Sequence, residues 1–189
     1  IFMDRNLGAV GTDYTKVTAC GLYYQWGRKD PFPYPASFTN NARPASFIYH
    51  DGHAYGTIRP EDYDAREVMS VEWATQHPTT FIHKADYEVD EPEEDVLDWL
   101  FRSHHNLWGN TTEQGYDVSK VCRKTIYDPC PPGWRVPDAC DFEGIAMSQT
   151  QLPYCVNIVY SGTKTVRYPA GGTFDGDSYS GAGTYGQVY

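Results

Sequence analysis

Hydrophobic and polar residues follow a regular period in only a few short stretches of this chain. Five stretches have the composition and alternation of β-strands: residues 1–9, 21–27, 79–82, 156–160 and 163–168. The last two flank Ser161-Gly162, a dipeptide typical of tight turns, and so predict a β-hairpin. The pattern therefore predicts short strands separated by long connections.

Segments with the period of a helix are also short. Residues 60–77 predict a helix that ends before Pro78. Residues 92–102 begin with a proline and acidic residues, which suit a first helical turn, and carry one apolar arc: Val96, Leu97, Trp99, Leu100 and Phe101. A last helix is predicted from the N-cap Asp138, with these residues on one face: Ala139, Phe142, Ile145 and Ala146. Strands and helices together indicate an α+β fold.

Prolines and glycines mark the loops. Prolines at positions 31, 33 and 35 argue against a helix or a central strand there, and residues 36–60 contain repeated turn signals. Residues 103–125 are polar and turn-rich. Residues 171–186 hold six glycines in 16 residues, which predicts a loop with little helix or strand propensity.

Residues 124–137, here called the proline corner, contain three prolines and a glycine between Asp128 and Gly133. Each proline fixes its own φ and restricts the residue before it, so we expect a rigid turn. We expect Trp134 to be buried as the packing centre of this turn, because large aromatics mostly supply packing area. The other residues expected to be structural here are Cys130, Arg135 and Pro137. A binding site at the corner is the alternative interpretation.

Composition limits the partners. The 189 residues include 40% hydrophobic ones, enough for a core, and no run approaches the ~20 apolar residues of a membrane span. The formal net charge of −10 argues against nucleic acid, whose phosphates attract basic surfaces. The content of Tyr, Trp, Gly and Pro is typical of loop-rich extracellular domains that contain β-strands.

The chain has five cysteines, an odd number, and no Cys-x-x-Cys pair of the kind that binds zinc. Four of them fall close together around the proline corner: Cys122, Cys130, Cys140 and Cys155. In an oxidising compartment we expect at least one disulfide among these four. One thiol would then be left free or would pair outside this chain.

The sequence offers no complete catalytic or metal-binding motif, and we predict neither a cofactor nor a metal. The histidine pairs His50/His53 and His104/His105 lack a third ligand at suitable spacing. Glu91-Pro-Glu93 and Asp175-Gly-Asp177 supply too few oxygen ligands for calcium. An acidic first helical turn and a solvated turn explain these two pairs.

Several segments occur together in one order: Met3–Ala9, Leu22–Arg28, Pro78–Ile82, Asp98-Trp99, Leu107–Gly109 and Lys124–Pro137. In this order they resemble the major paralogous domain family (FISUMP-type) of surface and fimbrial-type proteins of Bacteroidetes and related bacteria. That family is in turn similar to C-type-lectin-like folds. The resemblance implies an irregular antiparallel sheet with two or three short helices and long loops. It also implies one domain over residues 1–189, truncated at both ends, with inserted loops at about 31–60 and 83–119.

The resemblance implies an exported protein, displayed at the cell surface as a lipoprotein or appendage component. Its expected function is a non-enzymatic binding or adhesion module whose partners are glycans or other surface proteins. A structural subunit of a surface appendage is the alternative. A less favoured alternative from the same fold neighbourhood is an enzyme like the formylglycine-generating oxidases, which use paired reactive cysteines.

We expect recognition to fall to aromatic side chains in the long loops, because loops on a rigid scaffold commonly carry binding residues. The candidate ligand-binding residues are Tyr34, Tyr49, Tyr55 and Tyr116. The alternative is that these tyrosines only attach the loops to the core.

Overall fold

The computed structural model describes residues 1–38, 56–83, 99–102, 104, 106–109, 123–150, 153–160 and 164–185. The chain forms two compact units that alternate along the sequence. The first unit comprises Ile1–Tyr23, Phe32–Phe47 and Asp141–Tyr189, and the second comprises Tyr24–Pro31 and Ile48–Cys140. The chain changes unit four times, and the first two changes fall within two strands that pair with each other, β1 (Tyr23–Tyr24) and β2 (Pro31–Phe32). The prediction of a single domain stays a prediction.

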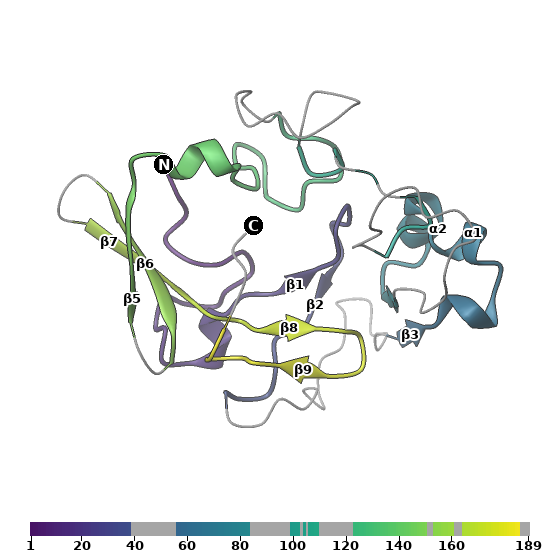
Figure 1. The fold of residues 1–189 in the computed structure, drawn as a ribbon, viewed down its shortest axis with the longest axis horizontal. Coiled ribbons are helices and arrows are strands. Elements are labelled where there is room, and N and C mark those ends of the chain that lie inside the picture. The colour runs from purple at the N-terminus through teal and green to yellow at the C-terminus, as the bar shows by residue number, and fades with distance from the viewer. Residues whose placement is uncertain are drawn as a thin grey trace. The chain divides into compact units, whose positions relative to one another are not determined.

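The first unit is built mainly from antiparallel strands (Figure 1). Its largest sheet has the order β5-β6-β7, with bounds Ala146–Thr150, Cys155–Tyr160 and Lys164–Pro169. The central strand carries the most buried side chains, among them Cys155 and Ile158, each 2% exposed. A single turn of 3₁₀ helix, η1 (Val17–Ala19), belongs to the same unit.

A second, smaller sheet of this unit pairs β8 (Thr173–Phe174) with β9 (Tyr179–Ser180). It is held by aromatic packing: the rings of Phe174 and Tyr179 face each other across the pair and stack with their centroids 4.5 Å apart. Tyr23 packs against both of these rings, and Phe32 packs against Phe174. Aromatic pairs of this kind stabilise a short hairpin whose intrinsic strand propensity would not be sufficient to form it.

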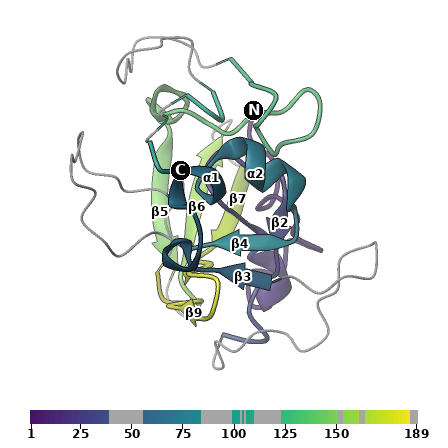
Figure 2. The ribbon, with the colours of Figure 1, turned by 90° about the vertical axis from the view of Figure 1, so that its right-hand side faces the viewer.

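The second unit packs short helices on a parallel strand pair (Figure 2). Its elements, in order, are β3 (Gly56–Ile58), η2 (Pro60–Asp62), α1 (Ala65–Val68), α2 (Val71–Gln76) and β4 (Thr80–Ile82). Asp64 and Ser70 cap α1 and α2 by accepting hydrogen bonds from backbone N–H groups of their first turns. The core joins these elements to the segment from Trp99 to Leu107, and its buried members are Val68, Met69, Ala74, Ile82, Trp99, Leu100 and Leu107.

The architecture confirms the prediction of an α+β fold with small, mostly antiparallel sheets and few helices. The helical region at 60–77 is confirmed, and α2 ends at Gln76, just before Pro78. The strand at 79–82 is found as β4, and the predicted hairpin is found as the antiparallel pair β6–β7. The predicted helix at 92–102 falls mostly outside the described residues, and residues 99–102 are not helical.

Two predictions about local structure are wrong. Residues 1–9 form no strand, because the chain turns at Asn6, whose carbonyl accepts from the N–H of Ala9. The helix expected from Asp138 is one 3₁₀ turn, η3 (Ala139–Phe142), ended by Gly144 at a φ of 71°. Ala146 instead begins β5, which pairs along its length with β6.

Strands also occur where loops were expected. Pro31 lies in β2, in a two-stranded sheet where every strand is an edge, and edges tolerate proline. The glycine-rich residues 171–186 contain β8 and β9. In that hairpin, the Asp175 carboxylate closes the turn by accepting from the N–H groups of Asp177 and Ser178.

We predict that Gly27→Ala destabilises the second unit by about 2–4 kcal/mol. Gly27 has a φ of 77°, which disfavours any residue with a Cβ, and an added Cβ would overlap the side chain of Leu107. All five tryptophans lie in this unit, so urea unfolding followed by tryptophan fluorescence reports on it. In the control Gly56→Ala, the new Cβ meets nothing within 4 Å. An equal midpoint for Gly27→Ala and the control would contradict the prediction.

Candidate functional site

The proline corner contains two consecutive tight turns. In the first, the N–H of Asp128 bonds the carbonyl of Thr125 at 3.4 Å. In the second, the N–H of Trp134 bonds the carbonyl of Pro131 at 3.0 Å, and Gly133 has a φ of 84°. A proline followed by a glycine with positive φ is the sequence that a type II turn requires, which explains why this segment turns here.

A buried carboxylate fixes the two turns relative to each other. The side chain of Asp128 is 0% exposed. Its Oδ1 accepts from the N–H of Cys130 at 2.7 Å, and its Oδ2 accepts from the N–H of Val136 at 3.0 Å. Lys124 neutralises it, with Nζ 2.8 Å from Oδ1, and also donates to the carbonyl of Cys130 at 2.6 Å. Charged hydrogen bonds inside a protein are among the stronger ones, so the corner is held rigidly.

The corner is also attached to the core of the second unit. The hydroxyl of Thr125 donates to the carbonyl of Leu107, a core residue. The ring of Tyr127 packs on the same core, and the N–H of Tyr127 bonds the Thr125 hydroxyl oxygen at 3.1 Å. The architectural role predicted for this segment is therefore carried by Asp128, Thr125 and Tyr127, none of which the sequence had singled out.

The expectation that Trp134 is the buried packing centre is wrong. Its side chain is 37% exposed, and it directly follows the Pro-Gly turn that its N–H closes. Ile126, at the centre of the first turn, is 75% exposed. Arg135 and Pro137 are half-buried, and Arg135 donates to the carbonyl of Val136 at 3.1 Å. Each turn of this rigid segment therefore presents an apolar side chain to solvent.

The disulfide expected around the proline corner stays a prediction. Cys20, Cys130, Cys140 and Cys155 are free thiols in this structure, and Cys122 lies outside the described residues. Burial, together with the neighbouring Asp128 carboxylate, raises the pKa of the Cys130 thiol to about 11. Burial likewise raises the pKa of Cys20 to about 12. Thiols with raised pKa values hold little thiolate at neutral pH and are poor nucleophiles.

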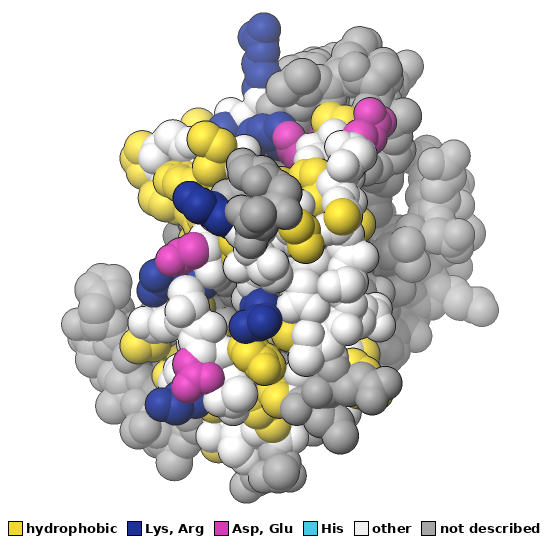
Figure 3. Space-filling view, turned by 90° about the vertical axis from the view of Figure 1, so that its left-hand side faces the viewer, with side chains coloured by type: hydrophobic (Ala, Val, Ile, Leu, Met, Phe, Trp, Pro, Cys, Tyr) yellow, Lys and Arg dark blue, Asp and Glu magenta, His cyan; other side chains and the backbone are white. Residues whose placement is uncertain are grey.

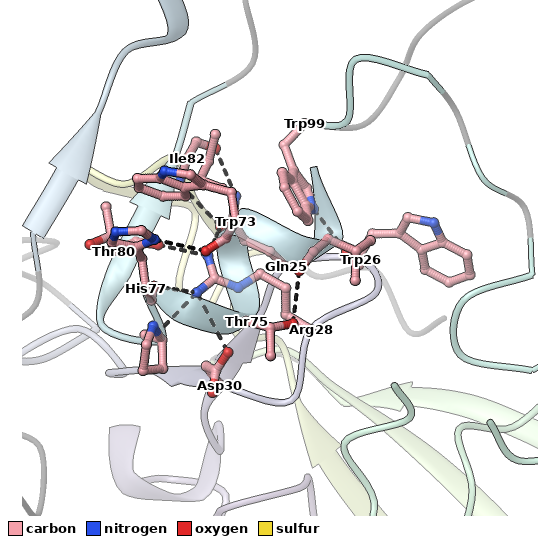
Figure 4. A network of polar contacts seen from close by, with 12 residues as sticks. Gln25, Trp26, Arg28, Asp30, Trp73, Thr75, His77, Thr80, Ile82 and Trp99 are labelled. Carbon is pink, nitrogen blue, oxygen red and sulfur yellow. Dashed lines mark hydrogen bonds and ion pairs between the residues drawn. The ribbon is translucent and has the colours of Figure 1, made fainter. Parts of the chain in front are cut away.

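A second buried network lies in the same unit and is centred on Arg28 (Figure 4). The Arg28 guanidinium donates to two carbonyls of the α2–β4 connection, His77 at 3.1 Å and Pro78 at 3.2 Å, and to that of Thr80, the first residue of β4, at 2.6 Å. It also donates to Gln25 Oε1 at 2.9 Å. These carbonyls follow the end of a helix, where unpaired acceptors gather and a positive charge is favoured.

The side chain of Gln25 bonds both backbone groups of Ile82, as the backbone of a neighbouring strand would. Its side-chain nitrogen donates to the carbonyl of Ile82 at 2.8 Å, and its side-chain oxygen accepts from the N–H of the same residue at 3.2 Å. Two tryptophans donate to backbone carbonyls that follow Gln25 in the chain. Trp99 Nε1 donates to the carbonyl of Trp26, and Trp108 Nε1 donates to the carbonyl of Arg28. The network therefore replaces regular hydrogen bonding between residues 25–28 and β4.

The charge of Arg28 is balanced in part by Asp30, whose Oδ2 lies 3.5 Å from Nη2. Burial raises the pKa of the Asp30 carboxyl, and the attraction of Arg28 offsets this only in part. The guanidinium also lies 5.9 Å from the ring centroid of Trp99. Arg28 is fully buried, with its side chain 1% exposed, and is suited to holding the fold.

The tyrosines predicted to bind ligand are not brought together by the described residues. Tyr34 is half-buried in the first unit, and Tyr49, Tyr55 and Tyr116 lie outside the described residues. Among the described residues, no group of three His, Cys, Asp or Glu side chains is placed to hold a metal ion. The Asp175 carboxylate is engaged by its own turn, as expected of a solvated loop.

No family model, curated protein or solved structure matches this chain. Within the described part of the chain, no helix has the length and hydropathy of a membrane span. The candidate site is therefore defined by geometry alone: the rigid proline corner with its exposed residues Ile126 and Trp134.

We predict that Asp128→Asn destabilises the second unit by about 3–5 kcal/mol. The amide would direct donor hydrogens toward backbone N–H groups and leave the Lys124 charge without its partner. Urea unfolding followed by tryptophan fluorescence measures the change. Asp62→Asn, an exposed position in η2, removes the same charge and should change stability by less than about 0.5 kcal/mol. Equal effects of the two variants would show that Asp128 does not hold the corner.

We also predict that Arg28→Lys costs about 2–4 kcal/mol although it keeps the charge. A single ammonium cannot reach the carbonyls that the guanidinium bonds from two nitrogens, so buried acceptors lose their donors. The matched control is Lys29→Arg, a reverse exchange at the neighbouring exposed position. Retention of wild-type stability by Arg28→Lys would mean that charge alone is sufficient.

Proposed function

We propose that this protein is a non-enzymatic binding module of an exported surface protein, and that it binds glycans through the proline corner with Trp134 as the central contact. The proposal joins the resemblance to the major paralogous domain family and its C-type-lectin-like relatives with one structural observation. That observation is a tryptophan, 37% exposed, at the end of a turn whose base is fixed by a buried carboxylate.

Rigid presentation is what makes this tryptophan suitable for binding. An aromatic face can stack on the apolar side of a sugar ring, and its large area contributes most when little side-chain or loop entropy is lost. The turn is already ordered by the bonds from Cys130 and Val136 to Asp128. The half-buried Arg135 follows directly in sequence and bears a guanidinium, a donor for hydroxyl or carboxylate oxygens.

The chemistry of the corner supports binding more than catalysis. The Asp128 carboxylate is fully buried and accepts three hydrogen bonds, and Lys124 is paired with it. An enzyme of the formylglycine-generating type would need a reactive thiol, and the raised pKa of Cys130 disfavours that role. A structural subunit of a surface appendage remains the alternative function.

The test is binding of wild type and Trp134→Ala to an immobilised panel of neutral and acidic glycans. We predict that the variant loses at least about 2 kcal/mol of binding free energy, roughly 30-fold in affinity, as aromatic hot spots do. Its stability should fall by about 1 kcal/mol or less, because the ring is partly exposed. Thermal melting measures that change.

Tyr63→Ala is the matched control, since Tyr63 is an exposed aromatic of the same unit, 56% exposed, outside the corner. It should leave glycan binding unchanged. Undiminished binding by Trp134→Ala, or a wild-type protein that binds no member of the panel, would refute the proposal. If instead Trp134→Ala unfolds the second unit, Trp134 is a packing residue and the site lies elsewhere.

A further inference from the structure

Strand β5 is an exposed edge of the three-stranded sheet. In the order β5-β6-β7 it pairs on one side only, with β6, in the register Ala146↔Val159 to Thr150↔Cys155. Four of its five residues are exposed and the fifth is half-buried. Within the described part of the chain, its backbone makes no hydrogen bond on the outer side. An edge of this kind presents N–H and C=O groups that can pair with another strand.

The opposite edge of the same sheet is protected. Strand β7 carries Lys164 and Arg167 and ends in Pro169, and charges and prolines are the usual means of preventing edge pairing. The N-terminal segment also covers β7, because Asn6 Nδ2 donates to the carbonyl of Pro169 and the hydroxyl of Tyr168 donates to the carbonyl of Met3. Strand β5, with the sequence Ala-Met-Ser-Gln-Thr, has no charge and no proline.

An apolar row crosses the sheet and ends at this edge. Val166 of β7 and Ile158 of β6 are paired neighbours and are 5% and 2% exposed. Met147 of β5 is the next residue in the row and is 55% exposed. Figure 3 looks onto the side of the molecule that carries the sheet and shows hydrophobic side chains among scattered charges of both signs. A further strand beside β5 would extend the row and cover Met147.

We propose that β5 pairs antiparallel with β5 of a second copy of this chain, about a twofold axis at Ser148, to form a continuous six-stranded sheet. In this register all five residues of β5 find a partner: Ser148 faces itself, Met147 faces Gln149, and Ala146 faces Thr150. Every facing pair has its side chains on the same side of the sheet.

The absence of charged residues from β5 favours a second copy of this chain as the strand that pairs with it. In a twofold pairing about Ser148, a charge at 148 would face its own copy and like charges at 147 and 149 would face each other, which is destabilising for strands in direct opposition. The neutral sequence of β5 avoids this, whereas a strand such as β7 would not. Because the contact is the same on both copies, it closes after two and does not extend into a filament.

The dimer is expected to be weak. Five residues span about 17 Å of strand, so the pairing buries less than the ~1,200 Å² of a stable interface. Sedimentation velocity over a protein concentration from about 10 µM to 1 mM should therefore show a monomer–dimer equilibrium with a dissociation constant inside that range.

The decisive comparison uses two double variants with the same number of charged residues. In Met147→Lys/Gln149→Lys, lysine faces lysine twice across the axis, and the dissociation constant should rise about tenfold. In Met147→Lys/Gln149→Glu, lysine faces glutamate twice, and the dimer should form at least as well as in wild type. Thr165→Lys adds a charge to the exposed face of β7 and should leave dimerisation unchanged.

Hydrogen exchange of the wild-type protein gives a readout that needs no variant. Amides of residues 146–150 should exchange more slowly at high than at low protein concentration, while those of residues 164–169 should not change. A wild-type protein that stays monomeric to 1 mM, or two double variants with equal dissociation constants, would overturn the proposal. Species larger than the dimer would overturn its closed symmetry.

Discussion

Backbone polar groups must find partners inside a protein, and in this chain side chains supply many of them. In the second unit, strands of two or three residues and helices of one or two turns leave many backbone groups of the long segments between them without a partner in regular structure. There, the Asp128 carboxylate accepts from two backbone N–H groups, and the Arg28 guanidinium donates to three backbone carbonyls. Gln25 binds both groups of Ile82. The conformation of the irregular segments follows from these buried polar residues.

This dependence explains what the sequence could predict. Helix α2 and strand β4 are set by local signals, the Ser70 cap, Pro78 and an apolar run, and both were predicted. The hairpin β8–β9 was not, because its stability comes from Phe174, Tyr179 and rings distant in sequence. Strand β5 was missed because Ala146 and its neighbours have no strong strand propensity and are fixed by pairing with β6.

The candidate site was predicted only in part. Prolines and Gly133 identified a rigid corner, since their effect on the backbone is local. Whether Trp134 faces the core or the solvent depends on the direction in which the whole turn leaves the core, which Thr125, Tyr127 and Asp128 determine together. The pairing state of a cysteine likewise depends on distances that spacing along the chain does not give.

The bonds of Asp128 have a consequence for how such a protein can change. Its carboxylate reaches the main chain at Cys130 and Val136, and main-chain N–H groups are the same whatever side chains lie between them. Substitutions at residues 131–135 that keep the turn conformation therefore alter the surface offered to a ligand while the frame below is retained. Selection could diversify recognition at this point with little loss of folding stability, as antibody loops do on their own scaffold.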